Sequence, residues 1–202
     1  MSLTFDHQWL VDRPPLPVPG KLFTIADLNA LPVEVPSGPV DYELDNGRLI
    51  TVVPPGDAHG AAQARLCSEL IVQGDKRGLG ATRTEVGVVL WRGPDRLVGP
   101  DVAFILKRSL PVRRSPEGYL ETIPELVVEI VSKNDTQPFL DREIADYLAA
   151  GVQLALVADP ESKTIIAYRP GGAVQTFNEH DTLTLDGILP EFRCAVAELF
   201  AA

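Results

Sequence analysis

The chain has 202 residues, 45% of them hydrophobic, so it is long enough to bury a full core, and its composition excludes a collagen-like, disulfide-rich or wholly disordered protein. A formal net charge of −10 disfavours broad attachment to nucleic acid or anionic lipid, although a local basic or metal-filled groove is compatible with a polyanionic substrate. Cys67 and Cys194 lie far apart and predict neither a zinc site nor a disulfide framework. With no recognisable secretion signal or membrane span, we expect a soluble, cytoplasmic protein without a membrane partner.

The first segment, residues 1–21, is expected to be an extended N-terminal arm. Its proline-rich end, residues 13–20, is incompatible with a helix or a central strand. Thr24 is then predicted to cap a short helix over residues 24–28. Since no repeat or linker divides the rest of the chain, we expect one domain over residues 22–202.

A β-hairpin is predicted for residues 40–53, where two strand-like segments flank an Asp-Asn-Gly turn. Asp41 and Glu43 share one face of its first strand, and the pattern alone favours a solvent-exposed face. A helix capped by Asp57 should follow and end near Gly74. His59 lies in its first turn, where a local hydrogen-bonding role is favoured because no nucleophile motif accompanies it.

Two apolar strands and their connector come next. We expect strands over residues 84–91 and 99–106, then a connector over residues 107–124 that is exposed and mobile because of its prolines, charges and length. A strand over residues 125–131 follows, and antiparallel pairing across the connector would bring Asp101 beside Glu129. The connector's basic residues would then lie about 20 Å from these carboxylates, at the other end of the strand.

Glu129 stands in the middle of a strand that is otherwise β-branched or apolar. An ionised carboxylate pays a heavy desolvation cost there unless it is paired or binds a metal, so Glu129 is a candidate for chemistry. Asp101 opens the other apolar strand and is a second candidate. A simpler alternative for Asp101 is a carboxylate at the strand edge that accepts hydrogen bonds from backbone N–H groups.

The remaining elements complete a mixed α/β pattern. Residues 132–138 lead into a helix that ends at Gly151, a strand over residues 152–158 follows, and two further short strands and an apolar tail end the chain. We therefore predict a mixed central sheet covered by helices, with additional β-hairpins at both ends.

A family resemblance follows from the order of these elements. Pro100-Asp101, Glu129 in an apolar strand, a helix, and Gly151-Val152 leading to a strand resemble the PD-(D/E)xK restriction-endonuclease-like superfamily. Within it, the chain from about residue 22 to its end resembles the bacterial Uma family of candidate endonucleases. Further short segments carry this narrower resemblance: Tyr42-Glu43-Leu44, His59, Leu126 to Ser132, Tyr147 to Val152, and Leu189-Pro190 through Leu199-Phe200.

The resemblance implies a Mg²⁺-dependent (or Mn²⁺-dependent) phosphodiesterase that acts on nucleic acid, with DNA expected more than RNA. Asp101 and Glu129 would hold the cation, and Glu43 would be an additional acidic residue at the rim. A homodimer is expected by analogy alone.

The lysine that this superfamily needs is missing from both of its usual positions. Val131 stands two residues after the strand carboxylate, and Glu143 stands on the helix where the Uma family has its lysine. Arg142 should point into solvent, and Lys133 would have to fold back to help. Because losing such a charge costs about 10² to 10³ in rate, two functions stay open: a weak or divergent nuclease, and a non-catalytic binding or assembly module.

Overall fold

The computed structural model describes residues 20–32, 34–35, 38–52, 54–112, 118–133 and 135–201. The predicted N-terminal arm lies almost wholly outside these residues, as does the middle of the connector. The described chain begins with α1 (Ile25–Leu28), whose N-cap Thr24 forms the reciprocal capping box with Asp27. The helix capped by Thr24 is thus confirmed.

Within the described residues, the central sheet has six strands in the order β12-β11-β10-β9-β8-β5. It combines antiparallel pairs with one parallel pair, β9 and β10, so the predicted mixed sheet is confirmed. The antiparallel pairing of β8 with β9 across the connector is also as predicted. The strand bounds are β5 (Gly80–Thr84), β8 (Val102–Leu106), β9 (Leu126–Ile130), β10 (Leu154–Asp159), β11 (Thr164–Tyr168) and β12 (Val174–Phe177).

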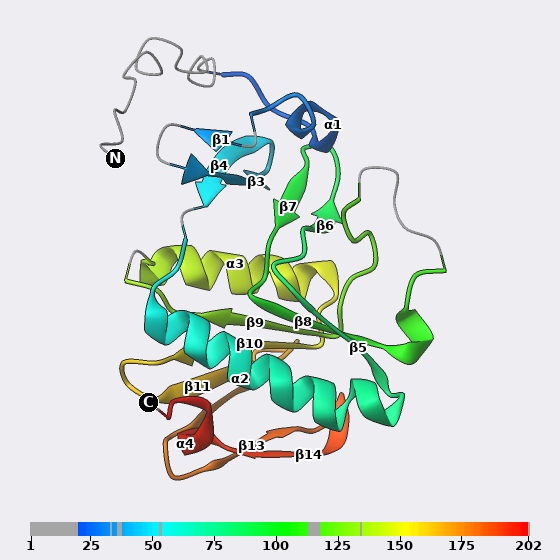
Figure 1. Ribbon diagram of the computed structural model, residues 1–202. Helices are drawn as coiled ribbons and strands as arrows, with labels where there is room; N and C mark the ends of the chain where they lie inside the picture. Colours follow the sequence, from blue (N-terminus) through cyan, green and yellow to red (C-terminus); the bar gives the residue numbers. More distant parts are fainter. Residues whose placement is uncertain are drawn as a thin grey trace, which may run out of the picture.

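A second sheet of the described chain, in the order β4-β3-β7-β6, lies beyond α3 at one end of the molecule (Figure 1). It contains the predicted hairpin, β3 (Asp41–Asp45) with β4 (Arg48–Val52), beside β6 (Val88–Trp91) and β7 (Arg96–Val98). A short pair, β1 (Glu34–Val35) and β2 (Gly38–Pro39), precedes it.

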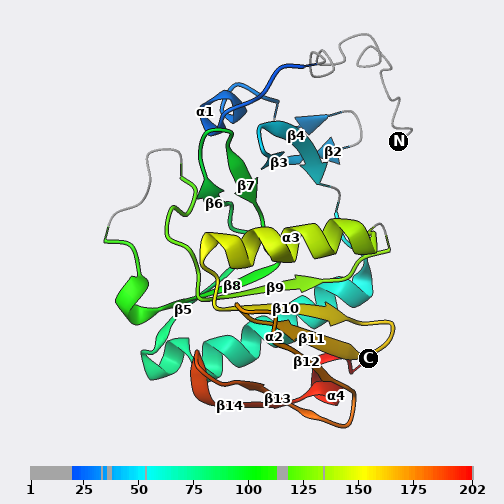
Figure 2. The same cartoon turned by 180° about the vertical axis from the view of Figure 1, so that it is seen from behind.

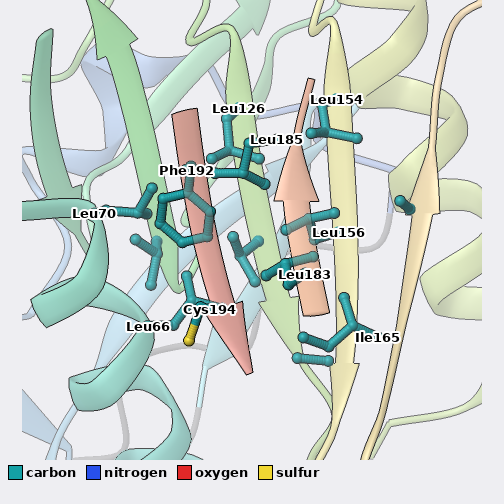
Figure 3. Packing of buried hydrophobic residues seen from close by; sticks show 14 of the residues in the cluster. Leu66, Leu70, Leu126, Leu154, Leu156, Ile165, Leu183, Leu185, Phe192 and Cys194 are labelled. Atoms are coloured by element: carbon teal, nitrogen blue, oxygen red, sulfur yellow. The ribbon is translucent and has the colours of Figure 1, made fainter. Parts of the chain in front are cut away.

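The two faces of the central sheet are covered by different helices, as both views show (Figure 1 and Figure 2). One face packs against α2 (Asp57–Gln73), the hairpin of β13 (Thr182–Leu185) and β14 (Leu189–Ala195), and α4 (Val196–Leu199). Figure 3 shows its core, where Leu66 and Leu70 of α2 meet Phe192 and Cys194 of β14 over the strands. The other face packs against α3 (Gln137–Ala150), which crosses from β9 to β10 and ends at Gly151 in the left-handed conformation.

Several predicted boundaries are wrong, for local backbone reasons. The predicted strand over residues 84–91 is two strands in different sheets, separated by Glu85 at φ 50° and by Gly87, where an added Cβ would lie 2.5 Å from the Tyr119 ring. The strand predicted from residue 99 begins at Val102, so Asp101 lies just before it. Gly56, not Asp57, is the N-cap of α2.

The connector is only partly exposed, contrary to the prediction. Val112 is 99% exposed, and the short 3₁₀-helix Lys107–Ser109 carries exposed cations. After the undescribed residues 113–117, however, Leu120 pairs with β6 through hydrogen bonds to Gly87 and Val89, and Ile123 packs beside α3. The second half of the connector therefore belongs to the packed structure.

Candidate functional site

Asp101 and Glu129 come from adjacent strands of the central sheet. The register pairs Val102 of β8 with Val128 of β9, so the next residues outward, Asp101 and Glu129, lie opposite each other. Side chains alternate along β9, which places Leu126, Val128 and Ile130 in the core toward α2 and leaves Glu129 on the side of α3. The structure thus brings together the two carboxylates that the sequence singled out.

These carboxylates line a cleft of about 360 Å³ between α3, the start of α2 and the β3–β4 hairpin. Its lining contains six carboxylate residues and, among the residues described, a single lysine. The titratable residues that line it are Glu43, His59, Glu85, Asp101, Glu129, Lys133, Asp135 and Glu143. Unless a cation enters, such a cleft repels a polyanion.

Asp101 is held by the backbone and by a histidine. Its Oδ2 accepts a hydrogen bond from the backbone N–H of Ile130 at 2.6 Å and lies 3.1 Å from Nε2 of His59. His59 is 6% exposed, and its Nδ1 has no partner among the described residues. Burial lowers the pKa of His59, but the hydrogen bond and the charge of Asp101 together raise it by more, so the net shift of this pKa is upward. His59 was expected to form a local hydrogen bond, but it contacts Asp101, which is 42 residues away.

Glu129 lies at the floor of the cleft beside α3. Its Oε1 accepts a 2.5 Å hydrogen bond from the hydroxyl of Tyr147, a residue that is completely buried. Burial, together with the charges of Glu143 and Asp101, holds the pKa of Glu129 well above its ordinary value. Such a shift favours the protonated form of the carboxyl group, and an approaching cation would favour the ionised form.

Glu143 projects from α3 into the same cleft and meets a buried arginine. It is 6% exposed, and its Oε1 lies 3.6 Å from the guanidinium of Arg96. Burial and the nearby Glu43 raise the pKa of Glu143 to about 8, although Arg96 acts in the opposite direction. Arg96 also donates to Asp146 at 2.8 Å and to the carbonyl of Leu44 at 3.3 Å, so it joins α3 to β3.

Glu43 was expected on a solvent-exposed face, and this expectation is wrong. It lines the cleft and accepts a 2.8 Å hydrogen bond from the backbone N–H of Gly99. Burial raises its pKa, which the Gly99 hydrogen bond and Arg96 oppose. A Cβ at Gly99 would lie 3.3 Å from Oε1 of Glu43, so a small residue lets the carboxylate reach this backbone.

The cations considered in place of the missing lysine lie elsewhere or at the rim. Lys133 is exposed and lines the cleft. Arg142 is solvent-exposed, as predicted, and pairs with Asp45. Lys107 and Arg108 follow the far end of β8, away from Asp101, and the other two arginines of that cluster are not described.

The described residues do not gather three or more His, Cys, Asp or Glu side chains closely enough to hold a metal ion on their own. Mg²⁺, however, usually keeps several waters and takes only one or two protein carboxylates. Asp101 and Glu129 offer oxygen ligands of this kind, and both lie in a cleft lined by six carboxylate residues. The donor set therefore fits a hard divalent cation.

Three members of the site escaped the sequence reasoning. Glu85 at the rim lies inside the strand predicted over residues 84–91, Tyr147 entered only through the family resemblance, and Arg96 lies between two predicted strands. Their contacts depend on tertiary geometry, because Tyr147 and Glu129 are 18 residues apart and Arg96 and Asp146 are 50 apart. A buried-strand arginine in a chain of net charge −10 is the one signal that could have pointed to an acidic cluster.

Comparison with known proteins identifies relatives of this arrangement. Residues 25–197 match the model of the Uma2 family, described as "Putative restriction endonuclease". The crystal structure of a DUF820 protein from Anabaena variabilis ATCC 29413, titled a putative nuclease, aligns with a TM-score of 0.72 and 21% identity over 89% of this chain and 98% of that one. This likeness confirms the mixed α/β fold.

A second solved structure, a cryoEM structure of a DrdV–DNA complex, aligns with a TM-score of 0.34 and 18% identity over 71% of this chain and 14% of that one. A TM-score this low does not indicate a shared fold. No curated protein matches the chain. Among the described residues, no helix has the length and apolar character needed to cross a membrane.

Proposed function

The chain belongs to the Uma2 family, and from that premise we propose that it is a metal-dependent nuclease that hydrolyses phosphodiester bonds, with DNA favoured over RNA. The observation that carries the proposal is the convergence of Asp101 and Glu129, from adjacent strands, on an acidic cleft with raised carboxyl pKa values. Such a cleft binds a phosphate group only after a cation has reversed its local charge.

Asp101 and Glu129 are the proposed ligands of Mg²⁺ or Mn²⁺. A divalent cation held there would polarise the scissile phosphate and lower the pKa of a bound water. The contacts of the two carboxylates suit this role, because Ile130 N–H and Tyr147 O–H fix one oxygen of each group in place. His59 contacts the same Oδ2 of Asp101 that accepts the Ile130 hydrogen bond.

The remaining acidic residues and Lys133 have supporting roles in this proposal. Glu43 and Glu143 lie beside the two ligands and add negative charge that favours a divalent cation over a monovalent one. Lys133 at the rim is the proposed contact for a substrate phosphate. Because Lys133 is exposed and long, it is less preorganised than a lysine from the cleft floor, so slow turnover is expected.

Calorimetry with Mn²⁺ and a cleavage assay on mixed nucleic acids test the proposal together. Asp101→Asn and Glu129→Gln should each abolish Mn²⁺ binding and lower cleavage at least about 10²-fold. Glu161→Gln, which changes an exposed carboxylate in the turn after β10, is the matched control and should behave as the parent does. Unchanged Mn²⁺ affinity in both site variants would overturn the assignment of the ligands.

A second candidate function is a non-catalytic binding or assembly module on the same fold. The observation in its favour is the buried contact between Glu143 and Arg96, which fills the family's lysine position with a carboxylate that is bound to the protein itself. Cleavage that requires Asp101 and Glu129 excludes this function. Nucleic-acid binding without any such cleavage supports it.

Three organisational proposals accompany the nuclease: one domain over residues 22–202, a homodimer, and residence in the cytoplasm. Sedimentation at several concentrations tests the homodimer, which has twice the monomer mass. Urea or thermal denaturation tests the single domain, which should give one cooperative unfolding transition.

A further inference from the structure

The mouth of the cleft differs chemically from its floor. Phe139 and Val52 are each 40% exposed, and both line the cleft, so the two exposed hydrophobic side chains lie at one site. Pro54 and Pro55, also exposed, line it beside Val52. Apolar side chains therefore line part of the mouth, beside the charged rim residues Glu85 and Lys133, whereas the floor is formed by carboxylates.

On α3 and on the β3–β4 hairpin, which form two walls of the cleft, an apolar residue lies farther toward the opening than a carboxylate residue. On α3, Phe139 precedes Glu143 by four residues, so the two share a helix face about 6 Å apart along the axis. On the opposite wall, Glu43 of β3 pairs with Ile50 of β4, and Val52 lies two residues further on the same face, about 7 Å away. The ring of Phe139 and the side chain of Val52 thus lie on two different walls of the cleft, each nearer the opening than the carboxylates.

We propose that this mouth binds a nucleobase stacked on Phe139, and that the substrate is therefore single-stranded or locally unpaired nucleic acid. The inference rests on the proposed nuclease function and specifies its substrate class. In a duplex both faces of a base are already stacked, so Phe139 has no face to contact. An unpaired base offers both faces, and base stacking on aromatic side chains is the usual means of holding single strands without sequence preference.

The size and charge of the cleft agree with this occupant. A volume of about 360 Å³ suits a group the size of a nucleotide and not a double helix. Only one lysine lines the cleft among the described residues, so the backbone of a duplex would find few phosphate contacts. A single nucleotide needs one phosphate contact at the cation and one apolar contact for its base, and the two levels of the cleft provide these.

Phe139 is the residue to vary, because its ring projects from the first turn of α3 and is not part of a core. Binding of a short fluorescent single strand, and of its duplex, is measured by anisotropy in Ca²⁺. The parent should bind the single strand more tightly than the duplex. Phe139→Ala should weaken single-strand binding by about 5- to 150-fold, Phe139→Leu by less, and Phe139→Trp should preserve it. Val174→Ala, at an exposed apolar site on the distant β12, is the control and should have no effect.

A strand that lacks all of its bases separates stacking from backbone contact, because it should bind the parent and Phe139→Ala with equal affinity. Equal affinity for duplex and single strand, or no effect of Phe139→Ala, overturns the inference even if cleavage depends on Asp101. Conversely, a strong effect of Phe139→Ala on single-strand binding without any Asp101-dependent cleavage supports the base site and contradicts the nuclease.

Discussion

The two faces of the central sheet are built from the same strands but bury opposite kinds of side chain. Toward α2 and the β13–β14 hairpin, the described cluster is apolar throughout, with Phe192, Leu156 and Leu126 at most 1% exposed (Figure 3). Toward α3, the apolar packing is interrupted by Glu129 and Glu143. Because side chains alternate along β9, its residues contribute in turn to the apolar core on one face and to the acidic cleft on the other.

This difference explains how the chain carries unfavourable charge. Buried carboxylates with raised pKa values cost free energy of folding, and the large apolar cluster on the other face offsets that cost. The α3 face limits the cost with hydrogen bonds from Tyr147 and with the buried Arg96.

Phe192→Ala tests the apolar face and should have the largest effect. The ring is 1% exposed among Leu and Ile side chains, so its removal leaves a cavity and should lower the free energy of unfolding by about 3–5 kcal/mol. Phe139→Ala, at a 40% exposed ring, is the control and should change it by less than about 1 kcal/mol. Urea denaturation measures both, and similar losses would show that the α2 face does not dominate stability.

Arg96→Ala tests the ionic packing on the α3 face. It leaves the carboxylates of Asp146 and Glu143 without their buried cation and should cost about 3 kcal/mol or more. Arg142→Ala removes the exposed pair with Asp45 and should cost below about 1 kcal/mol. Equal costs for the two arginines would mean that Arg96 is no more than a surface-type ion pair.

Glu143→Lys tests whether the missing lysine limits the activity. The new ammonium group would enter the cleft beside Glu129 and should raise metal-dependent cleavage on the order of 10²-fold. The structure adds a cost that the helix alone did not predict, since the lysine would face Arg96. Thermal unfolding should therefore be measured in parallel. A stable variant with unchanged cleavage and metal affinity would place residue 143 outside the reaction.

The pH dependence of stability tests the carboxyl pKa values. Glu143 has a folded pKa of about 8, above its unfolded value, so its contribution is complete below about pH 4.5 and is lost as the pH rises to 8. In EDTA, the free energy of unfolding should fall by up to about 1.4 kcal/mol per pH unit in that window. Mn²⁺ should reverse the trend, because it stabilises the ionised carboxylates. A flat profile in EDTA would contradict the raised pKa.

The sequence predicted β8, β9 and β10, the α3 crossover and the position of Glu129 because strong apolar patterns and a glycine stop determine them locally, but it did not predict β5 or β7. It did not predict the break between Thr84 and Val88, where Glu85 has a positive φ that its residue type does not signal and Gly87 packs against the Tyr119 ring. It also missed Arg96 and the burial of Glu43. Both depend on contacts between elements more than 40 residues apart, which no local pattern encodes.

The spacing of the hydrogen bonds also has a consequence for the order in which the cleft forms during folding. Tyr147 and Glu129 are 18 residues apart within one β-α-β crossover, whereas Glu43 reaches Gly99 across 56 residues. Closing the longer loop costs more chain entropy and needs the β3–β4 hairpin to be in place. The chain should therefore complete the floor of the cleft before its outer wall, so that early folding intermediates carry Glu129 beside Tyr147 while Glu43 is still open to solvent.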